Sequence, residues 1–139
     1  MQSAGADSAR TAHDWVVVLM LRPIPSRILR STAEVAVCNG TDLYQEQTYD
    51  LYTVRRVHLQ PTEKIIKTRD NTDQQLAGVL FVDVRHSVPA LDWAALLQQA
   101  HDNGGDMRVT VRGVTYTVMT CDGLRDDTDR LHHWEIGVV

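Results

Sequence analysis

The stretch from residue 107 to residue 119, Met-Arg-Val-Thr-Val-Arg-Gly-Val-Thr-Tyr-Thr-Val-Met, decides the fold of this chain. Apolar residues alternate with polar ones on both sides of Arg112-Gly113. Such an alternation places the apolar side chains on one face of a β-strand, and a pair ending in glycine favours a tight turn. The stretch therefore predicts an antiparallel β-hairpin. Its expected inward-facing side chains are Met107, Val109, Val111, Val114, Tyr116 and Val118.

Four further strands are expected around this hairpin, over residues 32–38, 53–60, 78–84 and 131–139. Arg55-Arg56 interrupts the alternation of the second stretch and predicts a β-bulge there. The third stretch is apolar on both faces, which favours a central position in the sheet. The side chains expected to face inward are Ala33, Val35, Val37, Val57, Leu59, Leu80, Val82, Val84, His132, Trp134, Ile136 and Val138.

The segments between these strands carry turn and helix signals. Asn39-Gly40 predicts a turn that ends the first strand, residues 44–52 show no clear period, and residues 122–130 are expected to form an acidic loop. Asp92 is a candidate N-cap of a short helix that ends at Asn103-Gly104-Gly105. The helical side chains expected on one buried face are Trp93, Leu96, Leu97 and Ala100.

About six strands and one short helix, with turns at intervals of about ten residues, are typical of a small antiparallel β-barrel. The chain has 139 residues, enough for one domain, with 43% hydrophobic and 23% charged residues. These fractions are ordinary for a globular protein. A net charge of −4 does not favour a protein that coats nucleic acid, because phosphate binding needs clustered positive charge. The expected fold class is mainly β with one long inserted loop.

The inserted loop is the stretch from Pro61 to Ala77, which lies between two of the expected strands. Its only strongly apolar residues are Ile65, Ile66 and Leu76. A connection of this length in a compact domain is usually functional or disordered. We therefore expect a long exposed hairpin or loop. Its charged residues are Glu63, Lys64, Lys67, Arg69, Asp70 and Asp73.

The N-terminal region differs from the rest of the chain. Residues 1–14 are small and polar and are expected to form a loose tail. Trp15 to Leu21 is the longest apolar run, of seven residues, whereas a spanning helix needs about twenty. No small-residue cleavage site follows this run, so neither a membrane segment nor a secretion signal is expected. The two prolines of residues 22–26 predict an extended arm.

No metal site and no cofactor are expected from the sequence. Cys38 and Cys121 have no metal-binding spacing and are expected to be small buried hydrophobic residues. His132 and His133 occupy adjacent strand positions, so they are expected to point to opposite faces and not to share an ion. The aspartates of residues 122–129 lack the residue order of a calcium loop.

No enzymatic activity is expected either. Serine occurs in no Gly-x-Ser-x-Gly motif, and no glycine-rich loop precedes a helix. Asp83, His86 and Ser87 are close in sequence, but a catalytic triad needs three groups that converge in space, and nothing in the sequence indicates this convergence.

From about Met20 onward, the order of segments resembles the minor capsid proteins of tailed bacteriophages that serve as head-closure, or stopper, proteins of the neck. The resemblance covers about 120 residues, and residues 1–19 look like an added N-terminal extension to a head-closure domain over residues 20–139. The most specific motif is Leu131-His132-His133-Trp134-Glu135 after a hairpin. The other motifs are Arg-Pro-Ile-Pro (22–25), Val-His-Leu-Gln-Pro (57–61), Gly-Val-Leu-Phe-Val-Asp-Val-Arg-His-Ser (78–87) and Val-Arg-Gly-Val-Thr-Tyr-Thr-Val (111–118).

The resemblance implies a small β-barrel that assembles into a homo-oligomeric ring, a dodecamer, in the neck of the virion. The ring would lie between the portal–adaptor assembly and the tail-terminator or tail-completion protein, after assembly in the host cytoplasm. In such proteins an inward loop helps to close the channel for double-stranded DNA, and residues 61–77 occupy the place of that loop. The resemblance implies no chemistry.

The residues that would carry these roles fall into two groups. The channel-loop residues would be Glu63, Lys64, Ile65, Ile66, Lys67, Arg69 and Asp70. The residues expected in the core or at a subunit interface are Trp93, His132 and Trp134.

Two alternatives remain open at this point. A tail-completion or adaptor component of the neck would fit the same virion class, although adaptors are typically helical. A small β-barrel that binds nucleic acid would need exposed aromatic residues beside basic ones, whereas Phe81 and Tyr116 lie in runs that are expected to be core.

Overall fold

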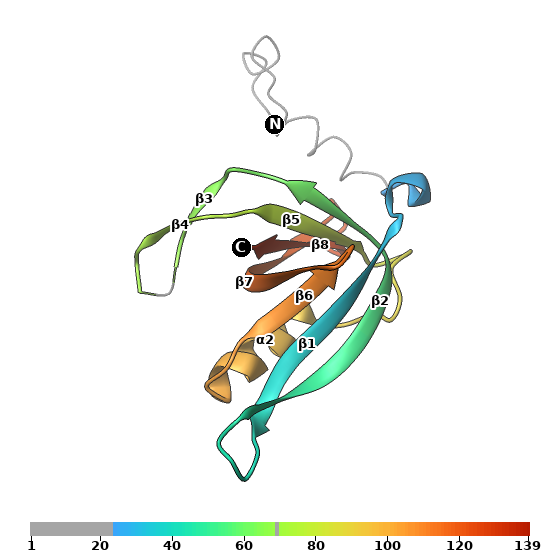
Figure 1. Cartoon of the computed structure of the whole chain (residues 1–139). Coiled ribbons are helices and arrows are strands. Elements are labelled where there is room, and N and C mark those ends of the chain that lie inside the picture. The colour runs from blue at the N-terminus through green and yellow to red at the C-terminus, as the bar shows by residue number, and fades with distance from the viewer. Residues whose placement is uncertain (1–23, 69) are drawn as a thin grey trace.

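The computed structural model describes residues 24–68 and 70–139 (Figure 1). The predicted tail over residues 1–14, the apolar run over residues 15–21 and residues 22–23 lie outside the described residues. A short 3₁₀ helix, η2 (Ser26–Ile28), precedes the first strand. The strands and the helix follow in the order β1 (Ser31–Thr41), β2 (Gln47–Pro61), β3 (Ile65–Lys67), β4 (Asp73–Gln75), β5 (Gly78–Asp83), α2 (Trp93–Asp102), β6 (Met107–Val111), β7 (Val114–Arg125) and β8 (Leu131–Val138).

Six of these strands form a closed antiparallel barrel in the order β1-β2-β5-β8-β7-β6. The pairing of β1 with β6, from Ala33↔Val111 to Val37↔Met107, closes the sheet on itself. β3 and β4 form a separate two-stranded sheet. The mainly β fold class is therefore confirmed. No helix in the described part of the chain is long and apolar enough to cross a membrane.

The β6–β7 hairpin confirms the prediction from residues 107–119. Val111 pairs with Val114 across the turn, and Arg112 and Gly113 have φ angles of 53° and 79°. Positive φ at both central residues defines a type I′ turn, whose twist matches that of the flanking strands. Val114 was expected to face inward but is exposed, because the hairpin end projects beyond the core.

Two strands are longer than their sequence patterns predict. β1 does not end at Asn39-Gly40, because the chain makes a bulge between Cys38 and Gly40 and pairing continues to Thr41. β2 begins at Gln47, so much of the stretch without a clear period is strand. The expected acidic loop likewise shrinks to residues 126–130, because β7 continues to Arg125 and pairs with β8.

The predicted bulge at Arg55-Arg56 is present in β2. Ser31 pairs with Val57 and Thr32 with Arg55, so Arg56 is the extra residue, and its φ of 63° confirms the irregular backbone. The bulge resets the alternation, with the result that both Val54 and Val57 face the core.

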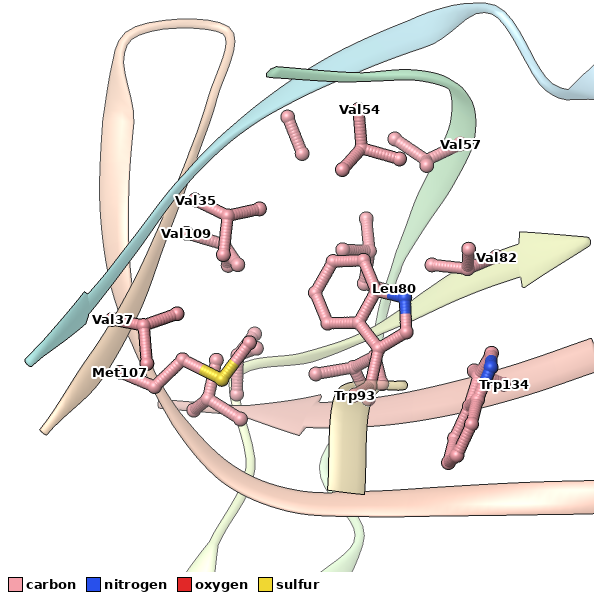
Figure 2. Packing of buried hydrophobic residues seen from close by; sticks show 14 of the residues in the cluster. Val35, Val37, Val54, Val57, Leu80, Val82, Trp93, Met107, Val109 and Trp134 are labelled. Atoms are coloured by element: carbon pink, nitrogen blue, oxygen red, sulfur yellow. The ribbon is translucent and has the colours of Figure 1, made fainter. Parts of the chain in front are cut away.

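The core fills the barrel interior and is closed at one end by α2 (Figure 2). Asp92 caps the helix, accepting a hydrogen bond from the backbone N–H of Ala95 at 3.1 Å. The helix ends in a Schellman motif, because Gly104 donates to the carbonyl of His101 and Gly105 to that of Ala100. Trp93, at the first helical position, is 0% exposed and points into the interior beside Leu80.

The strand β5 pairs with β2 on one side and β8 on the other, and in a closed barrel no strand lies at an edge. Leu80 and Val82 are buried, but Val84 is exposed because β5 ends at Asp83 and the chain turns there. The backbone N–H of Ser87 donates to the carbonyl of Asp83 in this turn. Asp83, the last residue of β5, is also buried.

Candidate functional site

The stretch from Pro61 to Ala77 forms a hairpin that stands away from the barrel (Figure 1). β3 and β4 pair antiparallel, from Ile65↔Gln75 to Lys67↔Asp73. Because these two strands belong to their own sheet, the hairpin does not share the backbone pairing of the barrel. The expectation of a long exposed hairpin is therefore confirmed, although its channel role is not tested by this geometry.

The root of the β3–β4 hairpin is fastened to the barrel at Leu76. The Leu76 side chain is buried, and its backbone N–H donates to the carbonyl of Lys64 at 2.8 Å. The next residue, Ala77, donates to the carbonyl of Val138 at 2.8 Å. A Cβ on Gly137 would clash with Oγ1 of Thr120 and would lie 3.0 Å from Cδ1 of Leu76, so glycine allows close packing there. The hairpin thus leaves the barrel from a fixed point beside the last strand.

The tip of the hairpin is held by its own side chains. The hydroxyls of Thr68 and Thr72 both donate to the carboxylate of Asp70, which lowers the pKa of that carboxyl below its usual value. Asn71 has a φ of 64°, the left-handed conformation that asparagine tolerates in turns. These local hydrogen bonds order the tip of the hairpin.

The charges along the hairpin are balanced. Lys67 and Asp73 form an exposed ion pair at 2.7 Å, and Glu63, Lys64 and Ile65 are exposed. Ile66 is half-buried and lines a cavity of about 390 Å³ between the hairpin and the barrel. The predicted residue Arg69 lies outside the described residues. The other residues lining this cavity are Lys67, Thr68, Asp70, His101, Met119 and Thr120.

The second predicted group, Trp93, His132 and Trp134, is buried within the chain. Trp93 and Trp134 both belong to the core cluster. A role of these side chains at a subunit interface is not tested by the single chain.

His132 and His133 do not point apart as adjacent strand residues were expected to. Their Nδ1 atoms lie 2.9 Å apart, and Nε2 of His133 lies 2.9 Å from a carboxylate oxygen of Glu135. The register shift between Leu124 and Arg125 leaves His132 as an extra residue in β8. This bulge turns the two rings toward each other. Within residues 24–68 and 70–139, no three His, Cys, Asp or Glu side chains gather as a metal site would require.

Asp83 and Ser87 come together for a structural reason. The hydroxyl of Ser87 donates to the carbonyl of Arg56 and accepts from the backbone N–H of Asp83 at 2.9 Å. Both contacts join the turn after β5 to the bulge of β2. This use of the hydroxyl orders the backbone and differs from the arrangement of a nucleophile beside a base.

The β1–β2 tip carries a feature that the sequence analysis did not identify. Leu43 and Tyr44 are 97% and 85% exposed at the end of the second long hairpin, which extends away from β3–β4 (Figure 1). Asp42 Oδ1 accepts from the backbone N–H groups of Tyr44 and Glu46, at 2.8 and 3.0 Å. An apolar pair after an aspartate, between a strand and a polar segment, is the sequence signal that could have identified this tip.

The chain matches the model of a known protein family. The family model described as "Minor capsid protein" matches residues 25–138, nearly all of the part of the chain that the structure describes. No curated protein and no solved structure matches the chain significantly. The match begins before the first strand and ends at the last residue of β8, so it spans the complete barrel together with the β3–β4 hairpin. This chain belongs to the minor capsid protein family of bacteriophages, a family of structural virion proteins.

Proposed function

We propose that this minor capsid protein is a head-closure protein, which forms a ring in the phage neck and uses the β3–β4 hairpin to close the DNA channel. The observation that carries the proposal is the separate hairpin sheet, rooted at Leu76 and projecting from a closed barrel. A barrel supplies a rigid body for packing around a ring, and a projecting element of fixed root can reach toward the axis of the ring.

The charge of the hairpin supports a gate that does not hold DNA. Protein–DNA affinity comes largely from lysine and arginine that neutralise phosphates. The hairpin pairs Lys67 with Asp73, and its acidic residues equal its basic ones in number, with Glu63, Asp70 and Asp73 against Lys64, Lys67 and Arg69. A channel element of this charge blocks passage by its volume and releases DNA without strong phosphate contacts.

The same features bear on the two alternatives. The described residues contain one α-helix, α2, which does not favour the helical architecture of an adaptor. A barrel that binds nucleic acid would present aromatic residues beside a basic surface, whereas Phe81 and Tyr116 are partly buried against the barrel. The partners proposed for the ring are the portal–adaptor assembly, a tail-terminator or tail-completion protein, and the packaged double-stranded DNA.

The test shortens the hairpin and keeps its root. Residues 67–73 are replaced by Asn-Gly, which joins Ile66 to Gln74 by a two-residue turn and leaves the Lys64–Leu76 hydrogen bond in place. Filled heads without tails that carry the shortened protein are treated with nuclease. We expect the genome to become sensitive, while electron microscopy still shows a ring at the neck.

A matched control separates the gate from the ring. The substitution Val114→Ala changes an exposed apolar residue of the β6–β7 hairpin, and we expect these particles to protect their DNA as the wild type does. Complete protection of the genome by the shortened protein would show that residues 67–73 do not close the channel. Absence of a ring from wild-type necks would contradict the head-closure function itself.

A further inference from the structure

We propose that the two ends of strand β1 carry oppositely charged surfaces, through which one copy of this chain binds the next. The surface around the start of β1 is called the arginine end and comprises Arg30, Arg55, Arg56 and Arg112. The surface around the far end of β1 is called the acidic end and comprises Asp42, Glu46, Asp50 and Asp102. This inference rests on the proposed ring, because it assigns the surfaces that join one subunit to its neighbour.

The arginine end is assembled from segments that are distant in the sequence. Arg30 precedes Ser31, the first residue of β1. The hydroxyl of Ser31 accepts a hydrogen bond at 3.2 Å from Nη2 of Arg112, which lies in the β6–β7 turn. Arg55 and the bulge residue Arg56 lie on the neighbouring strand β2, beside the first residues of β1. The fold therefore gathers four arginines around one end of this strand.

The charges of these arginines are not balanced by carboxylates in the described part of the chain. All four side chains are exposed, and the ion pairs formed within residues 24–68 and 70–139 involve other residues. Burial, followed by the charge of Arg112, lowers the pKa of His58 below its usual value. Glu34, the acidic residue of β1, accepts a hydrogen bond from the hydroxyl of Thr53 at 2.8 Å. The arginine end therefore presents positive charge that is available to a partner.

The acidic end lies at the opposite end of β1, beside the β1–β2 tip (Figure 1). β1 has 11 residues, so its two ends are about 30 Å apart. Asp50 accepts a hydrogen bond at 2.7 Å from the side-chain amide of Asn39, near the end of β1. Asp42 and Glu46 belong to the β1–β2 tip, and Asp102 ends α2, which packs against β1. Four carboxylates thus gather where β1 ends.

These carboxylates also lack an ion-pair partner among the described residues. Arg108 lies in the same region, but its Nε is 3.1 Å from a carboxylate oxygen of Asp106. Its guanidinium carbon also lies 5.5 Å from the centre of the Tyr49 ring. Arg108 is therefore already engaged within the chain, and the acidic end keeps its negative charge.

The two ends suit one another better than the arginine end suits DNA. A guanidinium group binds a carboxylate through two parallel hydrogen bonds, and complementary charges across an interface steer association and fix its register. Binding to DNA needs clustered positive charge without nearby negative charge, whereas this chain has a net charge of −4 and carries the acidic end on the same barrel. The favoured partner of the arginine end is therefore the acidic end of a second copy.

This arrangement also fits the symmetry of a ring. The two ends are different surfaces of one chain, so each copy can offer its arginine end to one neighbour and its acidic end to the other. Such head-to-tail contacts generate a closed ring when the rotation between copies closes. The β3–β4 hairpin projects from neither end of β1 (Figure 1), so it stays free when both ends are occupied.

The first experiment maps the contact directly. Arg30→Lys and Arg55→Lys together keep the positive charge and supply amines. Phage particles that carry this variant are treated with a carbodiimide, which joins an amine to a carboxylate without a spacer, and their peptides are analysed by mass spectrometry. We expect links from positions 30 or 55 to carboxylates of the acidic end. The two ends are about 30 Å apart in one chain, so each such link joins two copies. Links from these positions only to other carboxylates or to another protein, or no links, would overturn the proposal.

The second experiment reverses the charges at exposed positions. One variant carries Arg30→Glu and Arg55→Glu, another carries Glu46→Arg and Asp102→Arg, and a third carries all four substitutions. The amount of chain bound to filled heads is measured for each variant, and thermal unfolding checks that each variant is folded. We expect each double variant to bind at least about 10-fold less than the wild type, because like charges then meet. The fourfold variant should recover to within about 2-fold of the wild type, because opposite charges meet again.

A matched control tests whether net charge alone decides the result. Lys64→Glu and Arg130→Glu change the net charge as much as the reversal of the arginine end does, but both positions are exposed and belong to neither end. We expect this variant to bind like the wild type. An equal loss in this control, normal binding of the double variants, or no recovery in the fourfold variant would each overturn the proposal.

DNA is tested separately as the competing partner. The wild-type chain is mixed with a fluorescent double-stranded oligonucleotide at physiological salt, and we expect no change in fluorescence anisotropy. Binding that Arg30→Glu and Arg55→Glu abolish would assign the arginine end to phosphate groups and overturn the contact between copies.

The outcomes separate this inference from the proposed function. If electron microscopy shows the ring in wild-type necks and the double variants enter it normally, the contact is wrong and the ring stands. If wild-type necks contain no ring of this chain, the proposed function fails first.

Discussion

The barrel and the β3–β4 hairpin are stabilised in different ways. The barrel buries a continuous cluster that includes Leu80, Trp93 and Ile136, and burial of such side chains contributes about 1.5–3 kcal/mol each. The hairpin has two strands of three residues, an exposed ion pair and a tip held by local hydrogen bonds. Most of the free energy of unfolding therefore comes from the barrel and little of it from the hairpin. The hairpin can change its sequence or position at little cost to the fold.

The largest effect should come from Trp93→Ala. Trp93 is fully buried at the junction of α2 and the barrel, so we expect a loss of about 3–5 kcal/mol in the free energy of unfolding. Trp134→Ala should cost less, because Trp134 is 9% exposed and lines an open cavity of about 490 Å³. Denaturant unfolding of the purified chain measures both. A loss below about 1 kcal/mol for Trp93→Ala would contradict the assignment of stability to the barrel.

A smaller loss should follow from Gly105→Ala. A Cβ at this position would lie 2.3 Å from Sγ and 2.6 Å from Cβ of Cys38, and overpacking of this kind costs about 1–3 kcal/mol. Gly113→Ala is the comparison, because its Cβ would meet nothing within 4 Å but its φ of 79° strains an alanine. In thermal unfolding, the melting temperature of Gly105→Ala should be lower than that of Gly113→Ala. The reverse order would mean that Cys38 moves aside easily.

The burial of the Cys121 thiol should make the free energy of unfolding depend on pH. Burial raises the pKa of Cys121 from 9.0 to about 12, so the folded chain favours the neutral thiol. The resulting stability is present below pH 9 and is lost as the pH rises from 9 toward 12. We expect slow labelling by a thiol reagent at pH 8 and fast labelling after unfolding. Cys121→Ala should remove this part of the pH dependence. Cys121 is half-buried and not fully buried as expected, so fast labelling of the folded chain at pH 8 would show that its pKa lies nearer 9 than 12.

The smallest change in the free energy of unfolding should come from a substitution in the β3–β4 hairpin. Lys67→Ala removes the exposed ion pair with Asp73, and such pairs contribute about 0.2–1 kcal/mol. We expect a change in the free energy of unfolding of less than about 0.5 kcal/mol, with no dependence on salt above that of the wild type. A loss near that of Gly105→Ala would mean that the hairpin is part of the cooperative unit.

Much of the fold could be predicted because period-two alternation is a local property. The hairpin at Arg112-Gly113, the bulge at Arg56 and the cap at Asp92 all followed from adjacent residues. The length of β2 could not be predicted, because residues 47–52 become strand only by pairing with β1. The contact between His132 and His133 could not be predicted either, because it depends on a bulge in β8 that is set by the pairing of β8 with β7.

The candidate sites divide in a similar way. The β3–β4 hairpin was visible as a polar interruption between two apolar strands, from composition alone. The cavity of about 490 Å³ beside Trp134 was not visible, because it combines the loop before α2 with residues of β7 and β8 that meet only in the folded chain. The unpartnered atoms of Asp83 and Trp93 are likewise a property of packing, and no sequence pattern records them.

The separate sheet of the β3–β4 hairpin has a practical use. Its tip is closed by Thr68, Asp70 and Thr72, and its root is anchored to the barrel at Leu76 and Ala77. Related phages can therefore lengthen, trim or recode this segment during evolution while the barrel stays the same. A peptide tag or a fluorophore placed at Asn71 would report on the position of the hairpin in assembled particles.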